Sequence, residues 1–245
     1  MPGLPKLPRG RGDFVRQLVL GLAFVAGYQV ARGLADRGAA EAFRNGRHLL
    51  RFEDWLGALF EPRLQRWALG QGHLLIDAAN WTYWLSQLAV VGFALLWIYL
   101  CRIDSYRRVR DTFIVANTLG LISYVAIPTA PPRLFPARGF ADTVAGAGLG
   151  NATRLVELLA NPYAAMPSLH AADALIVGLA LAALCRPLWL KSLFALWPAW
   201  VVFSLLVTAN HSWLDIAAGA TAAALGAAAS AWLARHRGER LRTSP

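Results

Sequence analysis

The residues best suited to chemistry lie in three short polar clusters in the second half of the chain. The clusters are PTAPPRL at 128–134, MPSLH at 166–170 and TANHSWLD at 208–215. Together they supply two histidines, a carboxylate, an arginine and a serine, which suit the transfer of a phosphoryl group. One histidine can attack phosphorus, the other can protonate the leaving oxygen, and positive groups can hold the charge of the phosphate oxygens.

The third cluster pairs a histidine with an acid. His211 and Asp215 are four residues apart, so they share a helix face if a helix begins near Ser212. A carboxylate bonded to one imidazole nitrogen fixes the tautomer and raises the basicity of the other nitrogen, as a nucleophilic histidine requires. The spacing Ser212-x-x-Asp215 is also typical of a helix cap, and both interpretations stay open.

The second and first clusters offer anion-binding groups. Pro167 suits the first turn of a helix, so the following residues, Ser168 to His170, would present backbone amides at a helix N-terminus. The alternative is an ordinary cap with a histidine among lipid headgroups. Arg133 carries a fork of donors suited to phosphate, or it anchors a helix end at the membrane interface.

Three further residues are candidates for binding a substrate. Asp173 lies one turn beyond His170 inside an apolar run, where an acid is a functional candidate by default. It could bond His170 or a sugar-like acceptor, or have a buried structural partner. We also expect Tyr124 and Asn210 to line the site.

The elements that position these groups are predicted from composition. The chain has 245 residues, 57% of them hydrophobic, and a mean hydropathy of +0.42. Its apolar residues gather in runs of about 20, enough for a helix to cross a bilayer. Six runs are predicted to span: 14–34, 81–101, 112–128, 166–185, 189–209 and 213–234. The fold class is therefore all-α, a polytopic membrane helical bundle of six transmembrane helices.

The remaining segments complete the organisation of the chain. Residues 36–72 are too polar to span and predict one or two amphipathic helices lying in the membrane interface. Residues 1–13 are expected to be a flexible cytoplasmic N-terminus and 236–245 a cytoplasmic tail. A single membrane domain, 14–235, lies between them and carries its motifs within 128–215.

The net charge of +10 indicates orientation. In a membrane protein, lysine and arginine are kept on the cytoplasmic side, so we do not read the charge as a nucleic-acid site. The four segments that share one side hold 14 of the 24 basic residues: Lys6, Arg9, Arg11, Arg16, Arg102, Arg107, Arg108, Arg110, Arg186, Lys191, Arg235, Arg237, Arg240 and Arg242. We therefore expect cytoplasmic termini in a plasma (inner) membrane. All three polar clusters would then face the periplasm or exterior. A cleaved signal peptide is the alternative for the first run.

The motifs PSLH and HSWLD resemble those of the type 2 phosphatidic acid phosphatase superfamily. AMPSLH with PTAPPR looks most like its inositol phosphorylceramide synthase branch, and the resemblance covers the last four predicted spans. It implies that His211 is a nucleophile forming a phosphohistidine, that Asp215 orients it and that His170 is the general acid. Ser168 and Arg133 would bind phosphate.

The chain departs from the common pattern of this superfamily at three positions. Leu169 replaces a glycine, as in the synthase-like branch. Ala126 stands where a lysine is usual, and Leu205 where an arginine follows a serine. The resemblance therefore leaves open which basic residues complete the phosphate cradle. Arg138, Arg154 and the arginines of the first loop are the candidates.

These features favour an integral membrane phosphatase or phosphotransferase acting on a phospholipid or polyprenyl phosphate, without cofactor or metal. It would release phosphate, or transfer a phospho-headgroup such as inositol phosphate between lipids. One alternative is a transporter, although the polar groups cluster at one face of the membrane and do not continue across it. Another is a metal-dependent membrane hydrolase with His170, His211 and Asp215 as ligands. The lipid, the acceptor and the oligomeric state are left open.

Overall fold

The computed structural model describes residues 7–35, 38–144 and 163–243. Within these ranges the chain is helical, with one isolated bridge, Thr129 to Ala164, and no sheet, which confirms the all-α prediction. The α-helices are α1 (Gly10–Ala35), α2 (Ala39–Trp55), α3 (Glu61–Gly70), α4 (His73–Leu85), α5 (Val91–Cys101), α6 (Ile103–Ala126), α8 (Leu169–Leu184), α9 (Leu188–Val207) and α10 (Trp213–Thr243). A π-helical turn, η1 (Ser86–Val90), joins α4 to α5, and two 3₁₀ turns, η2 (Pro132–Leu134) and η3 (Pro136–Arg138), follow α6.

Each predicted span overlaps one of these helical segments. The runs correspond in order to α1, the end of α4 with η1 and α5, α6, α8, α9 and α10. Two stretches are long and apolar enough to cross a bilayer by themselves, Leu188–Val207 and Trp213–His236. Two shorter apolar helices, α8 with 16 residues and α5 with 11, are each below the ~20 needed, although the second predicted span also includes η1 and the end of α4. Six membrane crossings therefore stay a prediction.

The ends of the chain differ from the expected boundaries. α1 begins at Gly10, inside the segment expected to be flexible, and α10 continues through the predicted tail to Thr243. Both outermost segments therefore include helix.

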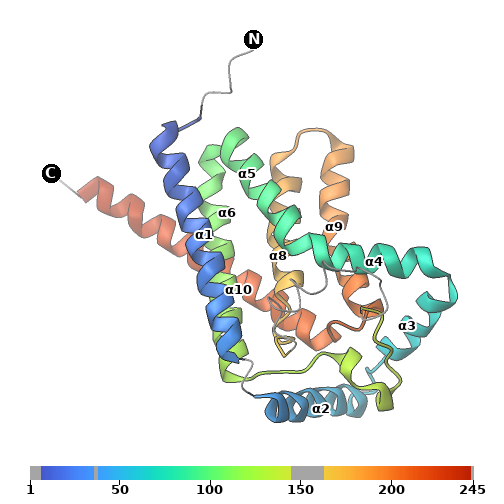
Figure 1. Cartoon of the computed structure of the whole chain (residues 1–245). Helices are drawn as coiled ribbons and strands as arrows, with labels where there is room; N and C mark the ends of the chain where they lie inside the picture. Colours follow the sequence, from blue (N-terminus) through green and yellow to red (C-terminus); the bar gives the residue numbers. More distant parts are fainter. Residues whose placement is uncertain (1–6, 36–37, 145–162, 244–245) are drawn as a thin grey trace.

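The central helices pack closely around small residues. α6 lies against α10, and α8 lies against both α9 and α10 (Figure 1). A β-carbon on Gly226 of α10 would collide with the Thr112 carbonyl oxygen of α6, and one on Gly219 would collide with the Ser168 carbonyl oxygen. These helices therefore approach backbone to backbone, which leaves no room for a larger side chain at either crossing.

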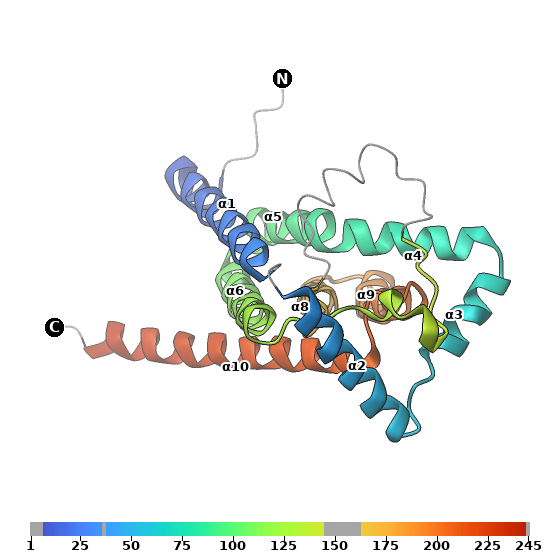
Figure 2. The same ribbon diagram turned by 60° about the horizontal axis from the view of Figure 1, so that its bottom comes forward.

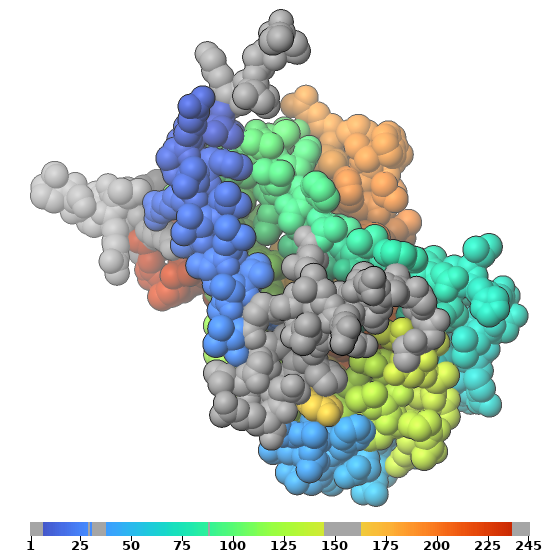
Figure 3. Space-filling view, viewed as in Figure 1, coloured from blue at the N-terminus to red at the C-terminus, as the bar shows by residue number. Residues whose placement is uncertain are grey.

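α2 and α3 frame the segment that follows α6. Figure 2 shows α2 lying across the end of the bundle, and Figure 3 shows it beside the segment that follows Pro128. The Ala130 amide donates to the Ala42 carbonyl oxygen at 3.0 Å, and the Asn45 side chain donates to the Pro128 carbonyl oxygen at 2.8 Å. The predicted amphipathic helices are thus present, and α2 holds the first polar cluster in place.

The exposed surface of this frame carries aromatic side chains among charged ones. The exposed aromatic residues are Phe52, Trp55, Phe60 and Trp67. Phe52 stacks on Trp55 with ring centroids 5.9 Å apart. Exposed aromatic residues on an amphipathic helix are typical of a surface that contacts lipid. Their contact with a membrane interface stays a prediction.

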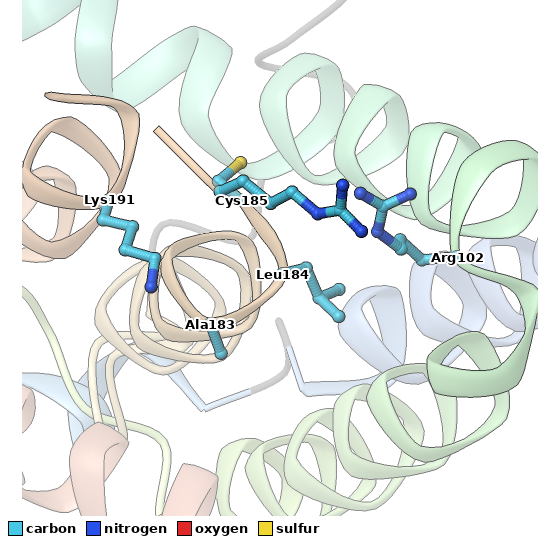
Figure 4. A pocket seen from close by; sticks show the side chains of 6 residues that line it. Arg102, Ala183, Leu184, Cys185 and Lys191 are labelled. Carbon is cyan, nitrogen blue, oxygen red and sulfur yellow. The ribbon is translucent and has the colours of Figure 1, made fainter. Parts of the chain in front are cut away.

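The opposite end of the bundle carries basic residues. The turns joining α5 to α6 and α8 to α9 lie there, away from α2 (Figure 1). A cavity of about 610 Å³ lies between these turns (Figure 4), lined by Arg102, Ala183, Leu184, Cys185, Arg186 and Lys191. This is the end expected to face the cytoplasm, and the orientation itself stays a prediction.

Candidate active site

Backbone hydrogen bonds join the first two polar clusters. The Thr129 amide donates to the Tyr163 carbonyl oxygen at 2.8 Å, and the Ala165 amide donates to the Thr129 carbonyl oxygen at 3.1 Å. The Tyr124 hydroxyl donates to the Pro167 carbonyl oxygen at 2.8 Å. The residues before α8 are therefore fixed against the end of α6 and the chain that follows it.

Two further backbone bonds attach the third cluster. The Arg133 amide donates to the Ala209 carbonyl oxygen at 2.8 Å, and the Ser168 amide donates to the Asp215 carbonyl oxygen at 2.9 Å. Ala209 itself adopts a left-handed conformation, with φ of 53°, in the turn between α9 and α10. The structure thus brings together three clusters that are up to 87 positions apart in the sequence, from residue 128 to residue 215.

His211 is buried and its ring is held by the backbone. Its Nδ1 lies 2.9 Å from the Ala165 carbonyl oxygen. Because a carbonyl oxygen only accepts, we assign the proton to Nδ1, which leaves Nε2 with a free lone pair. His211 therefore has the tautomer of a nucleophile.

Asp215 lies beside His211 without a hydrogen bond to it. Its Oδ2 lies 3.7 Å from His211 Nδ1, too far for a hydrogen bond. Oδ2 instead accepts from the Ser212 amide at 3.0 Å, while the Asp215 amide donates to Ser212 Oγ at 3.4 Å. These two bonds form the helix cap that the sequence also allowed. α10 begins at Trp213, so His211 lies in the turn before the helix.

His170 lies beside His211 at the start of α8. The two ring centroids are 5.8 Å apart, and the His170 ring stacks on Tyr83 with centroids 4.4 Å apart. Ser168 is the N-cap of α8, fully buried, with its hydroxyl oxygen accepting from the Ala171 amide at 3.4 Å. The helix start predicted around Pro167 is thus found two residues later, at Leu169.

Arg133 is held near the site by its backbone and by an acid. Its Nη1 lies 3.1 Å from Asp142 Oδ2, and its Nε is buried without a hydrogen-bond partner among the described residues. A phosphate at this guanidinium would therefore share it with a carboxylate. Of the other candidate cations, Arg138 pairs with Asp54 at 3.2 Å, and Arg154 lies outside the described residues.

The three candidate substrate contacts are each tied to the protein. Asp173 is buried and accepts from the Asn117 side chain at 2.7 Å. Asn210 donates to Thr208 Oγ1 at 2.8 Å, and Tyr124 supports Pro167 as described. These contacts are structural, and binding of a substrate by these residues stays a prediction.

Two functional candidates were missed in the sequence. Glu61 Oε1 accepts from the Trp213 amide at 2.9 Å, and Glu53 Oε1 accepts from the Leu214 amide at 3.2 Å. Both side chains are fully buried. In the sequence these acids stand among arginines, where a carboxylate is usually a solvated charge. The available signal was the helical spacing of Glu53 with Leu50 and Gly46, which places it on the buried face of α2.

The environment of these glutamates raises the pKa of both carboxyls. Burial, with the neighbouring charges of Glu61 and Asp215, raises the pKa of Glu53 to about 8. Burial is also the main cause that raises the pKa of Glu61. A carboxyl taken out of water favours its neutral form, so Glu53 keeps its proton to a higher pH than an ordinary carboxyl does.

In the described part of the chain, no three side chains of histidine, cysteine, aspartate or glutamate are grouped so that they could hold a metal ion.

Fold and site together define an all-helical protein in which two histidines, an acid and an arginine-bearing segment meet at one end of a bundle. The chain belongs to the PAP2 superfamily, whose family model matches residues 47–229. Membership indicates a phosphatase-type enzyme acting on phosphate esters. Neither the curated proteins nor the solved structures contain a match. The finer resemblance to the inositol phosphorylceramide synthase branch stays a prediction.

Proposed function

We propose that this protein is a membrane enzyme that cleaves or transfers a lipid phosphate ester through a phosphohistidine on His211. The observation that carries the proposal is the hydrogen bond between His211 Nδ1 and the Ala165 carbonyl oxygen. It leaves Nε2 as the free nucleophile, with the His170 ring beside it.

The first half of the proposed reaction forms the phosphohistidine. His211 Nε2 attacks phosphorus, an N–P bond forms, and the P–O bond to the lipid alcohol breaks. His170 gives its proton to the departing oxygen. The Asp215 carboxylate, 3.7 Å from Nδ1, stabilises the positive charge that develops on the His211 ring.

The second half restores the enzyme. His170 takes a proton from water or from an alcohol, whose oxygen attacks phosphorus and breaks the N–P bond. Water yields inorganic phosphate, and an alcohol yields a new phosphate ester. Arg133 and the amides at the start of α8 would hold the phosphate oxygens in both halves. This chemistry needs no metal.

The proposed substrate is a phospholipid or polyprenyl phosphate in the outer leaflet. The exposed aromatic residues of α2 and α3 lie on the frame around the site, where they would contact the lipid surface. The basic residues at the far end favour cytoplasmic termini and a site facing the periplasm or exterior. The likeness to the synthase branch favours transfer, with a phospho-headgroup such as inositol phosphate.

The test is phosphate release by purified protein in lipid, with phosphatidic acid or a polyprenyl phosphate as substrate. We expect release that survives EDTA and is abolished in His211→Ala. The matched control is His48→Ala, an exposed histidine on α2, which should retain wild-type activity. Loss with EDTA would favour a metal-dependent hydrolase, and equal activity in His211→Ala would refute the assigned nucleophile.

A transferase is distinguished by a second arm. If wild type releases no phosphate, labelled phosphoinositide is supplied with a lipid alcohol. Label that appears in the alcohol, and does so only when His211 is present, supports transfer. No product in either arm would contradict the proposal.

A further inference from the structure

The first turn of α10 has all of its amides bonded to side chains. A helix start normally leaves its first amides without partners inside the helix. The Ser212 and Asp215 amides bond within the helix cap described above. The other two, from Trp213 and Leu214, are taken by Glu61 and Glu53. Glu53 of α2 and Glu61 of α3 therefore hold the start of the helix that carries Asp215.

A helix start that needs only a cap does not require two buried glutamates. Both glutamates are fully buried, and each has one oxygen, Oε2, without a hydrogen-bond partner among the described residues. Asp215 Oδ1 is also buried without such a partner. Burying three carboxyls together is unfavourable unless they are protonated or well bonded. Two hydroxyl caps would satisfy the same amides at less cost, so the glutamates call for a further explanation.

The first turn of α10 lies beside the catalytic histidines. Asp215 sits 3.7 Å from His211 Nδ1, and its carbonyl oxygen accepts from the Ser168 amide. A shift of this turn would therefore change the charge beside His211. It would also move the N-cap of α8, two residues before His170.

We propose that Glu53 and Glu61 are positioning residues for the catalytic histidines, holding the first turn of α10 through the Trp213 and Leu214 amides. This rests on the proposed function. The two helices predicted only to lie at the membrane interface then have a second role, because they fix the geometry of the site.

Charge and protonation support this role. A carboxyl oxygen accepts a hydrogen bond from a helix N-terminal amide whether or not the group carries a proton. The groups that face Glu53 are Glu61 from α3 and, from α10, Asp215 with the Ser212 hydroxyl and the Leu214 amide. A protonated Glu53 keeps an oxygen for the Leu214 amide and avoids repelling the two acids.

The test replaces each glutamate in the full chain in lipid and measures kcat and KM per folded enzyme. Glu61→Ala and Glu53→Ala remove the acceptor, so we expect kcat to fall about tenfold or more with little change in KM. Glu61→Gln and Glu53→Gln keep an oxygen for the amide and should recover most of kcat. The control is Glu41→Ala, an exposed acid on α2 that pairs with Arg44.

A second readout is independent of activity. In protein with ¹⁵N-labelled histidine, the His211 ring signals are assigned by comparison with His211→Ala. We expect these signals to shift in the alanine variants and to return in the glutamine variants. If wild type shows no activity, the proposed function fails, and these signals still decide the positioning role.

The proposal is overturned if the folded alanine variants keep wild-type kcat and wild-type His211 signals. It is also overturned if the glutamine variants lose as much as the alanine variants. Should the alanine variants not fold, Glu53→Asp and Glu61→Asp replace them. Their carboxyls are one methylene shorter and withdraw from the amides, so the same losses are expected.

Discussion

The backbone carbonyl of Ala165 fixes the tautomer of His211. In the Ser-His-Asp triad a carboxylate has this role for the histidine base, and replacing it by an amide is severe because the tautomer is lost. Here Asp215 is 3.7 Å from Nδ1 and contributes charge instead. The hydrogen bond to Ala165 does not depend on that charge.

We therefore predict that Asp215→Asn retains measurable activity. The asparagine oxygen can still accept from the Ser212 amide, and only the charge beside the ring is lost. We expect kcat to fall about 10- to 100-fold, corresponding to about 1.4–2.7 kcal/mol of lost stabilisation. Steady-state kinetics beside His211→Ala measure this. An Asp215→Asn variant as inactive as His211→Ala would contradict the assignment.

The buried Glu53 carboxyl predicts a pH-dependent stability. Its pKa is about 8 when folded and near 4.5 as an ordinary carboxyl. Between these values the unfolded chain binds fewer protons than the folded one, so stability falls as pH rises through this window. We expect Glu53→Gln to flatten the decline in Tm between pH 5 and pH 8. Glu41→Gln, at an exposed position, should keep the wild-type slope, and an unchanged slope in both variants would refute the prediction.

At this scale, sequence reasoning found the chemical groups but not their partners. His170, His211, Asp215 and Ser168 were recognised by residue type and spacing, and the structure brings them together. The role of the Ala165 carbonyl could not be predicted, because every residue has a carbonyl. Glu53 was missed because an acid among arginines is usually a solvated charge.

Among the elements, the crossing of α10 with the start of α8 is the tightest part of the site. A β-carbon on Gly219 would collide with the Ser168 carbonyl oxygen and lie 3.0 Å from its carbonyl carbon. Backbone atoms cannot move aside as a flexible side chain can, so the helices themselves would separate.

We accordingly predict that Gly219→Ala destabilises the fold by about 1–3 kcal/mol, the usual cost of overpacking. It should also reduce activity by displacing Ser168. The matched control is Gly92→Ala on α5, where a β-carbon meets nothing within 4 Å. Thermal unfolding of both variants tests this. Equal Tm values for the two would show that the crossing is looser than described.

The positions of the helices were largely predictable from the sequence. The π-helical turn and the exact first residue of α8 were not. Apolar runs located the helices because burial and lipid both favour long apolar segments. The π-helical turn at Ser86–Val90 has no comparable signature. α8 starts at Leu169 because Ser168 caps it, a choice between neighbouring residues that hydropathy cannot make.

At the scale of the whole molecule, we predict that the basic end of the bundle faces the cytoplasm. Cys101 is exposed and Cys185 buried, both at the basic end of the bundle. We predict that a membrane-impermeant maleimide labels Cys101 in inverted vesicles but not in intact cells. A cysteine introduced by Arg51→Cys, at an exposed position on α2, should show the reverse in a Cys101→Ser background. Labelling of Cys101 in intact cells would invert the proposed topology.

The convergence of the three clusters followed from charge bias alone, since the bias placed all three on one side of the predicted membrane. The involvement of α2 and α3 did not follow, because packing between distant helices depends on three-dimensional shape. Hydropathy described their exposed faces, and the structure adds what their buried faces hold.

The central claim is that His211 carries the phosphoryl group, and trapping that intermediate tests it most directly. The enzyme is mixed with ³²P-labelled phosphatidic acid, quenched in alkali within its first turnover, digested and sequenced by mass spectrometry. The account predicts phosphate bound to His211 in wild type and none in His211→Ala. Phosphate release by wild type with label on another residue, or with no labelled protein under any quench, would contradict it.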